Sequence, residues 1–101
     1  MYYIYIIYSS VSDKYYIGFT DDLQRRVTEH NIKPYNTFTA KYRPWILKAA
    51  FECGGDLSIA MKLEKFIKKQ KSRKLIEQLL DPVFVPTGYL AQLVRVPDVR
   101  D

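Results

Sequence analysis

The sequence predicts an α+β domain in which a three-stranded, largely antiparallel sheet is flanked by helices, in the order β-β-α-β-α-α. Aromatic and β-branched runs without a breaker predict the strands, and apolar residues at helical spacing behind capping residues predict the helices. The 101 residues, 48% of them apolar and 27% charged, suffice for one domain with a buried core and are too few for two.

The chain begins with a predicted β-hairpin. Residues 2–8 are aromatic and β-branched throughout, which predicts a strand. Their alternate positions are apolar on both faces, so we expect this strand to be covered on both sides, as in the centre of a sheet. A polar turn over residues 9–13 then leads into a second strand over residues 14–19, the partner of the first.

A helix is predicted next, reaching to about Asn31. Either Thr20 or Asp21 can cap it, and Asp21 with Gln24 resembles a capping box. Acidic residues in the first turn suit the positive end of the helix dipole. The inward-facing stripe consists of Leu23, Val27 and His30.

The second half contains one strand and two further helices. A polar, basic loop over residues 32–43 precedes a strand around residues 45–51. Asp56 can cap a long helix, and a break near Ser72 separates it from a short helix over residues 73–80. The apolar stripe of the long helix consists of Leu57, Ala60, Met61, Leu63 and Ile67.

We expect residues 1–80 to form the domain and residues 81–101 to form a C-terminal tail without an assigned role. Pro82 and Pro86 end the regular pattern, and the tail mixes apolar with charged residues. It either packs as an additional strand or stays poorly ordered.

Composition excludes several classes of protein. No apolar run approaches the roughly 18 residues that a membrane span needs, and the N-terminus lacks the features of a signal peptide. The single cysteine, Cys53, has no disulfide partner, and the single histidine, His30, excludes a multi-histidine metal cluster. We therefore expect a soluble, cytoplasmic protein.

Charge gives the first indication of a partner. The net charge is +5, but residues 61–74 alone carry seven basic residues and one acid, so the rest of the chain is close to neutral. Such a stripe predicts a polyanionic partner, most simply nucleic acid; the alternative is a solvated helix face. The basic residues are Lys62, Lys65, Lys68, Lys69, Lys71, Arg73 and Lys74.

Two tyrosine motifs, Tyr3-Ile4-Tyr5 and Tyr16-Ile17-Gly18, lie on the predicted hairpin. With the residues that follow them, the sequence resembles the GIY-YIG nuclease family, particularly its small stand-alone bacterial members. The matching features occur in the family's order and spacing over about residues 1–80. They are Tyr5, Tyr16-Ile17-Gly18, the helix start at Thr20 to Leu23, Arg26, His30-Asn31, Arg43-Pro44-Trp45, and Met61 to Glu64 leading into Lys68.

The resemblance implies the fold predicted above and metal-dependent hydrolysis of a nucleic-acid phosphodiester. This reaction needs an activated oxygen nucleophile, positive charge at the phosphoryl oxygens and a metal at the leaving oxygen. By position, Glu64 is the family's metal ligand, and a carboxylate suits Mg²⁺ or Mn²⁺. The alternative is an exposed i,i+4 ion pair with Lys68.

The resemblance also makes Arg26 the catalytic arginine. Its guanidinium fork suits the charge that develops on a phosphoryl group. The alternative is a surface ion pair with Asp22 or Glu29. Arg25 is a natural control, because consecutive helical residues point roughly 100° apart.

By resemblance, Tyr5 is the base or water activator, Tyr16 orients the water or phosphate, and His30 assists proton transfer. A phenol has a pKa of about 10, so Tyr5 would need nearby cations to lower its pKa. The alternatives are two core aromatics and a cationic histidine at a helix C-terminus. Gly18 is explained by backbone room, which lets phosphate or the helix approach closely.

Two departures from the family pattern stand out. Tyr3 occupies the position of the glycine in the first motif. Many relatives also carry a late asparagine in the site, whereas the asparagines here are Asn31 and Asn36. That function is therefore missing or filled differently.

These observations predict a Mg²⁺-dependent endonuclease acting on DNA in branched, nicked or single-stranded form, in repair or recombination; RNA stays open as the substrate. The alternatives are a non-catalytic nucleic-acid-binding module on the same scaffold and, third, a domain whose basic helix binds an acidic protein. The expected phosphate-binding residues are Lys41, Arg43, Lys65, Lys68, Lys69, Lys71, Arg73 and Lys74.

Overall fold

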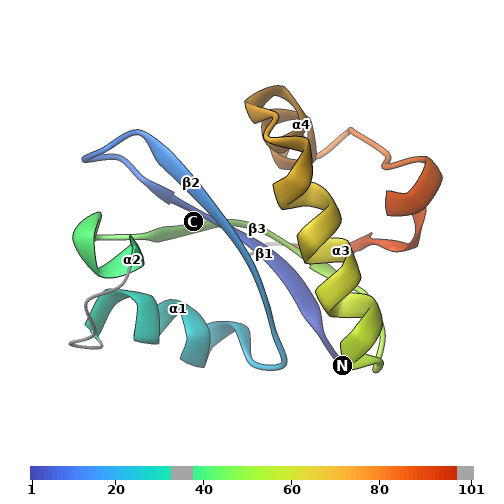
Figure 1. Ribbon diagram of the computed structural model, residues 1–101, viewed down its shortest axis with the longest axis horizontal. Helices are drawn as coiled ribbons and strands as arrows, with labels where there is room; N and C mark the ends of the chain where they lie inside the picture. The colour runs from blue at the N-terminus through green and yellow to red at the C-terminus, as the bar shows by residue number, and fades with distance from the viewer. Residues whose placement is uncertain (33–37, 98–101) are drawn as a thin grey trace.

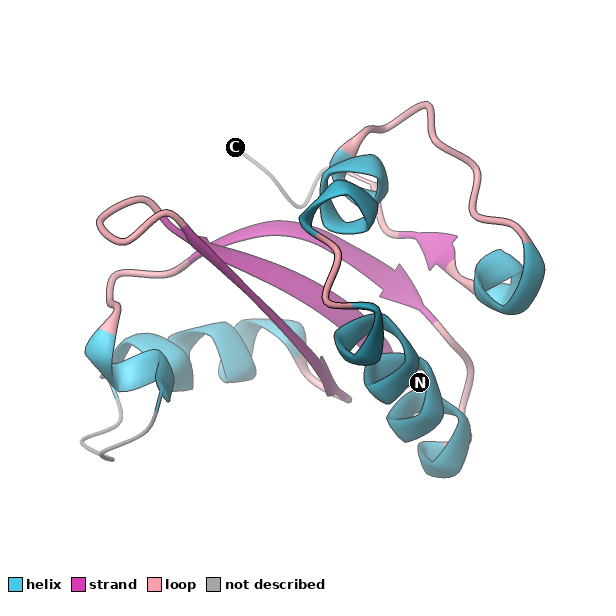
Figure 2. Cartoon of the chain, turned by 45° about the horizontal axis from the view of Figure 1, so that its top comes forward, coloured by secondary structure: helices cyan, strands magenta, loops and turns pink. Residues whose placement is uncertain are grey.

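The computed structural model describes residues 1–32 and 38–97 and confirms the expected α+β class (Figure 1). The antiparallel sheet has four strands in the order β2-β1-β3-β4, one more than predicted. Helix α1 covers one face of the sheet, and α3 and α4 cover the other (Figures 1 and 2). The elements are β1 (Tyr3–Ser9), β2 (Lys14–Thr20), α1 (Leu23–Ile32), α2 (Phe38–Lys41), β3 (Ile46–Glu52), α3 (Leu57–Gln70), α4 (Arg73–Leu80), the 3₁₀ helix η1 (Gly88–Gln92) and β4 (Val94–Arg95).

Strand β1 is covered on both faces, as its sequence predicted. Ile4 and Ile6 point into the core beneath α3 and α4, whereas Tyr5 and Ile7 point into a second core beneath α1. All four side chains are at most 1% exposed. Successive residues of a strand point to opposite faces, so this continuous apolar run supplies both cores.

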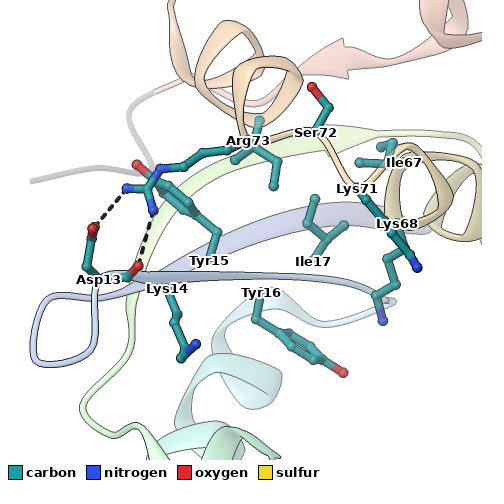
Figure 3. A pocket seen from close by; sticks show the side chains of 11 residues that line it. Asp13, Lys14, Tyr15, Tyr16, Ile17, Ile67, Lys68, Lys71, Ser72 and Arg73 are labelled. Atoms are coloured by element: carbon teal, nitrogen blue, oxygen red, sulfur yellow. Dashed lines mark hydrogen bonds and ion pairs between the residues drawn. The ribbon is translucent and has the colours of Figure 1, made fainter.

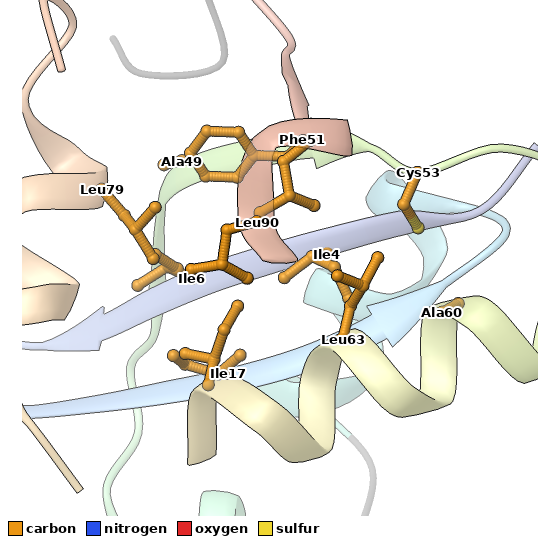
Figure 4. Packing of buried hydrophobic residues seen from close by; sticks show 12 residues of the cluster. Ile4, Ile6, Ile17, Ala49, Phe51, Cys53, Ala60, Leu63, Leu79 and Leu90 are labelled. Atoms are coloured by element: carbon orange, nitrogen blue, oxygen red, sulfur yellow. The ribbon is translucent and has the colours of Figure 1, made fainter. Parts of the chain in front are cut away.

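The larger core lies under α3 and α4 (Figure 4). Ala60, Leu63 and Ile67 fill it from α3, in line with the predicted stripe. Leu57 and Met61, which the same stripe included, are instead 46% and 51% exposed. Both side chains therefore lie outside the buried stripe of the helix.

Helix boundaries follow the capping chemistry. Asp56 caps α3 by accepting a hydrogen bond from the amide of Ser58. Lys71 adopts a left-handed conformation with φ of 48°, and Ser72 then caps α4, so the predicted break is confirmed. At α1 the prediction was wrong by one residue, since the carboxylate of Asp22 accepts from the amide of Arg25.

The tail packs against the domain. Leu90 and Leu93 are 6% and 5% exposed in the larger core, and β4 pairs antiparallel with β3. One guanidinium nitrogen of Arg95 donates to the carbonyl oxygens of Leu79 and Asp81, at 2.7 and 2.9 Å, at the end of α4. Of the two alternatives for the tail, the additional strand is the one observed.

The segment before β3 contains more structure than the predicted loop. Helix α2 interrupts it, and the peptide bond between Arg43 and Pro44 is cis. The remainder of that loop prediction, over residues 33–37, lies outside the described residues. Within the described chain, none of the helices combines the length and apolarity needed to cross a membrane.

Candidate active site

The candidate site lies along the outer edge of β2, between α1 and α3. Strand β2 is at one end of the sheet, with α1 on one side of it and α3 on the other (Figure 1), so side chains of both helices can reach its outer edge. Tyr16 points from β2 to the α1 side, and Lys68 extends toward it from α3 (Figure 3). Its ammonium lies 4.7 Å from the centroid of the Tyr16 ring. Residues of the two helical layers therefore meet at this edge.

Gly18 allows Tyr5 to reach this edge. The two residues are paired on β1 and β2. A Cβ on Gly18 would lie 2.2 Å from the Tyr5 hydroxyl oxygen and 2.4 Å from Cζ. The tyrosine ring therefore lies across the Gly18 backbone, in the space of a missing side chain. Backbone room is confirmed as the reason for this glycine, but Tyr5 occupies the space, where we expected phosphate or the helix.

The Tyr5 hydroxyl is hydrogen-bonded inside the site. It lies 2.7 Å from Nε2 of His30 on α1, and the Arg26 guanidinium also interacts with it. A guanidinium only donates hydrogen bonds, so the hydroxyl oxygen accepts from Arg26, whereas the direction of the bond to Nε2 depends on the tautomer of His30. When the neutral ring carries its proton on Nδ1, Nε2 accepts from the hydroxyl.

Burial sets the protonation state of both partners. His30 is 3% exposed, and burial together with the positive charge of Arg26 lowers its pKa to about 4. The alternative of a cationic histidine at the helix end is therefore wrong at neutral pH. Burial also raises the pKa of Tyr5 above its usual value, although Arg26 acts in the opposite direction. The cation near Tyr5 does not produce the lowered pKa that a free base would need.

The C-terminal end of α1 is held by the segment that enters β3. The Asn31 side-chain amide donates to the Trp45 carbonyl at 3.0 Å and accepts from the Trp45 amide at 2.7 Å. Nε of Arg43 donates to the His30 carbonyl at 2.6 Å. These contacts fix the helix turn that carries His30. Asn31 is thus used in the scaffold, and it does not supply the late asparagine of the family pattern.

Neighbouring arginines on α1 have separate surroundings. Arg26 pairs with Glu29 at 3.2 Å and interacts with Tyr5, so the expected surface pair exists alongside the contact with the site. Arg25 pairs with Asp21 at 2.9 Å, with both side chains more than half exposed. The helical turn thus directs only Arg26 of the two toward Tyr5.

Glu64 is the carboxylate on the α3 side of the site. Its side chain is 20% exposed and pairs with Lys68 at 3.5 Å, so the predicted i,i+4 pair is present. It also lines a groove of about 440 Å³, here called the α3 groove, with Phe19, Met61, Lys65 and Lys68. The electrostatic influence of Glu64 reaches Tyr5, where it raises the pKa of the phenol.

The donor set at Glu64 fits a hard divalent cation. Mg²⁺ is usually held by one or two carboxylates together with waters and phosphate oxygens. Over residues 1–32 and 38–97, no three His, Cys, Asp or Glu side chains form a metal-binding group. A half-buried carboxylate beside an open groove suits an ion that is shared with a substrate phosphate.

A second groove, the hairpin groove, continues along β2 beyond Lys68. It has a volume of about 550 Å³ and runs between β2 and the junction of α3 with α4 (Figure 3). Tyr16 and Lys68 lie at one end and Asp13 and Arg73 at the other. The two grooves thus share Lys68 and flank the edge of β2. Their cationic lining residues are Lys14, Lys62, Lys65, Lys68, Lys71 and Arg73.

The cations expected to hold nucleic acid are distributed unevenly. Arg73 pairs with Asp13 at 2.7 Å and with Glu77 at 3.5 Å, which attaches the hairpin turn to α4. Arg43 holds the end of α1, as described above. For both arginines a scaffold contact is therefore present, and nucleic-acid binding stays a prediction. Lys65, Lys68 and Lys71 line the grooves, whereas Lys41, Lys69 and Lys74 are exposed on α2, α3 and α4.

Two features of the site had no signal in the sequence. Asn31 clamps Trp45 across 14 positions of the chain, and the joint of the two grooves at Lys68 depends on how α3 crosses β2. Neither contact follows from spacing along one element. The pairing of Tyr5 with Gly18 could have been found by counting residues through the hairpin turn.

Tyr5, Arg26, His30 and Glu64 thus lie around one edge of the sheet. The family model of the GIY-YIG catalytic domain matches residues 1–77. The chain belongs to the GIY-YIG family, which implies a nucleic-acid substrate. A UPF0213 protein of Haloquadratum walsbyi is 34% identical over 82 residues, which cover 78% of this chain and 90% of the relative.

Proposed function

We propose that this protein is a divalent-metal-dependent endonuclease that hydrolyses phosphodiester bonds in DNA. The observation that carries the proposal is the convergence of Tyr5, Arg26 and His30 with Glu64 around the edge of β2. Phosphoryl transfer needs an activated water as nucleophile, compensation of negative charge and a cation site; these side chains are suited to activate the water, compensate the charge and hold the cation. Membership of the family supports nuclease chemistry in general.

Glu64 is the proposed ligand of Mg²⁺ or Mn²⁺. When bound, the ion supplies positive charge to the phosphate and to the oxygen that leaves. The half-buried position of Glu64 in the wall of the α3 groove supports this role, since a phosphate in the groove would lie next to the carboxylate. The ion then compensates the repulsion between two anions.

The proposed path for a proton runs through the hydrogen bonds around Tyr5. With its ring proton on Nδ1, His30 would accept the Tyr5 hydroxyl proton at Nε2, 2.7 Å away, while the hydroxyl oxygen receives a proton from the attacking water. Because burial raises the pKa of Tyr5, the phenol acts as a relay and not as a preformed phenolate. The resulting hydroxide attacks phosphorus, the bond to the leaving oxygen breaks, and that oxygen takes a proton from solvent. His30 then returns its proton to solvent by the same path.

Arg26 is suited to stabilise charge at the phosphoryl group. Its side chain is 37% exposed, so the guanidinium has a face toward solvent while Glu29 and Tyr5 hold it in place. A held guanidinium loses little freedom when it binds an anion, and its fork matches two phosphoryl oxygens. Tyr16, on the adjacent strand, is placed to orient the phosphate or the water.

The substrate form follows from the two grooves. Both grooves are lined by cationic side chains and follow the edge of β2. Contacts between cationic side chains and the phosphates of the backbone do not read the base sequence. We therefore expect recognition of DNA structure, such as branches, nicks or single strands, with low sequence specificity. Repair and recombination are the processes that present such forms.

The test is cleavage of labelled single-stranded, duplex, flap and four-way-junction DNA, with a matched RNA strand, in Mg²⁺ or EDTA. We expect Glu64→Gln to reduce cleavage by at least about a hundredfold while binding changes little. The control Glu77→Gln removes the same charge from the exposed face of α4 and should leave cleavage intact. Normal cleavage by Glu64→Gln would refute the metal-ligand role.

Arg26 and Arg25 form a second matched pair. Arg26→Lys keeps the charge but loses the fork, and we expect it to reduce cleavage by about a hundredfold, whereas Arg25→Lys should have no effect. Binding without cleavage on every substrate, with or without metal, would favour the non-catalytic binding module instead.

A further inference from the structure

Lys68 differs from the other lysines of α3 in its position between two grooves. The α3 groove and the hairpin groove are separate, and Lys68 lines both of them. A nucleic-acid strand that follows the edge of β2 from one groove into the other therefore passes Lys68. Lys65 and Lys71 each line one of the two grooves.

The ammonium of Lys68 is already placed among the site residues. It lies 3.5 Å from Oε1 of Glu64 and 4.7 Å from the centroid of the Tyr16 ring. Its positive charge also contributes to the lowered pKa of His30. The lysine thus lies between the proposed metal ligand and the tyrosine of β2, where the scissile phosphate is expected.

We propose that Lys68 is a positioning residue that exchanges partners during catalysis. Without metal, its ammonium neutralises Glu64; when a divalent cation binds Glu64, the ammonium turns to the non-bridging oxygens of the substrate phosphate. The inference rests on the proposed function, because it takes Glu64 to be the metal ligand. It adds that the Lys68 ammonium competes with the metal for the Glu64 carboxylate. This competition gives a reason for the metal and the nucleic acid to bind cooperatively.

The physical basis is competition for one carboxylate. An ammonium and a divalent cation cannot both approach the same oxygen closely, because their charges repel each other and their bonding positions overlap. Lys68 is 42% exposed and has a flexible four-carbon stem, so it is able to leave Glu64. A phosphate placed beside the metal offers it a new anion.

The exchange makes a thermodynamic prediction. Metal binding releases the ammonium for phosphate, so metal should raise the affinity for nucleic acid, and nucleic acid should raise the affinity for metal by the same factor. A surface ion pair without this function would contribute a little to helix stability and nothing to metal affinity.

The experiment measures metal affinity in the absence of nucleic acid. Terbium(III) is a hard, oxygen-preferring ion, and its luminescence is sensitised by nearby tyrosine, which Tyr16 and Tyr5 provide. We would titrate the wild-type protein, Lys68→Gln, Lys69→Gln and Glu64→Gln with terbium and confirm the site by displacement with Mg²⁺. Lys69→Gln is the matched control, since it removes the same charge from the next, exposed position of α3.

We expect Lys68→Gln to bind terbium about three- to tenfold more tightly than Lys69→Gln, because a cation beside the carboxylate has been removed. Equal affinity of these two variants would overturn the inference. If Glu64→Gln also abolishes the terbium signal, the proposed metal site stands and only the exchange fails. If Glu64→Gln binds terbium as the wild type does, the metal-ligand assignment fails and the exchange fails with it.

A second measurement tests the other half of the exchange. Affinity for a labelled oligonucleotide is measured with and without Ca²⁺, a hard cation used here as a non-catalytic probe. We expect Ca²⁺ to increase the affinity of the wild type and of Lys69→Gln for the oligonucleotide. In Lys68→Gln, most of this increase should be absent. An undiminished Ca²⁺ effect in Lys68→Gln would show that the ammonium does not pass to the phosphate.

Discussion

Gly18→Ala is the sharpest test of how the sheet builds the site. A Cβ at this position would lie 2.2 Å from the Tyr5 hydroxyl oxygen, whereas ordinary contacts begin near 3.4 Å. The ring would have to withdraw by about 1 Å or more. Tyr5 is 1% exposed, so no free space receives it, and its 2.7 Å hydrogen bond to His30 would be lost or distorted.

Overpacking costs about 1–3 kcal/mol, and loss of the hydrogen bond adds about 1 kcal/mol, so we expect a loss of about 2–4 kcal/mol in the free energy of unfolding. Urea unfolding followed by circular dichroism measures this change. Cleavage by the folded variant should fall in kcat, because the tyrosine proposed to relay the proton has been displaced. Gly55→Ala is the control, since nothing lies within 4 Å of its Cβ.

A double-mutant cycle with Tyr5→Leu separates the clash from other effects of the alanine. With the long ring gone, Gly18→Ala should cost far less, and the coupling energy should exceed about 1 kcal/mol. The account is refuted if Gly18→Ala is as stable as Gly55→Ala, or if its cost is the same with tyrosine and with leucine at position 5.

Three further predictions concern the surroundings of the site. The pKa of His30 is about 4 in the folded protein and about 6.5 in the unfolded chain. As the pH falls, the unfolded chain therefore binds a proton first. Stability should fall by up to about 3 kcal/mol as the pH drops from 6.5 to 4, and His30→Gln should flatten the unfolding curves measured across this range. Asn31→Ala removes both side-chain hydrogen bonds to the backbone of Trp45, so thermal unfolding should show a loss of about 1–3 kcal/mol, and an unchanged melting temperature would contradict the clamp. Arg95→Ala should cost about 2 kcal/mol by the same assay, whereas the exposed Arg25→Ala should cost less than about 0.5 kcal/mol.

Local chemistry explains why much of the fold could be predicted. The doubly apolar run of β1, the cap at Asp56 and the break before Ser72 each depend on residues close together in the chain. The missed fourth strand, in contrast, depends on an interaction that is not local. The fourth strand exists because the tail returns to the edge of β3, where Leu90 and Leu93 gain burial.

The same division applies to the site. Helical spacing placed Arg26 and His30 on one face of α1, and hairpin pairing placed Tyr5 and Tyr16 on adjacent strands. The spacing of residues along the chain could not predict the protonation states of His30 and Tyr5. His30 is neutral and Tyr5 keeps its proton because the packing of α1 against the sheet removes both from water, and solvation is a property of the assembled layers.

The sequence by itself therefore determined the first three strands, the helices α1, α3 and α4, the family pattern and the residue types that phosphoryl chemistry requires. The tertiary structure alone decided that Tyr5 crosses over Gly18, that Asn31 holds the end of α1 and that Lys68 joins two grooves beside Glu64. The physical reason is that each of these contacts joins different elements, and their distances are set when α1 and α3 pack on opposite faces of one sheet and meet around its edge strand.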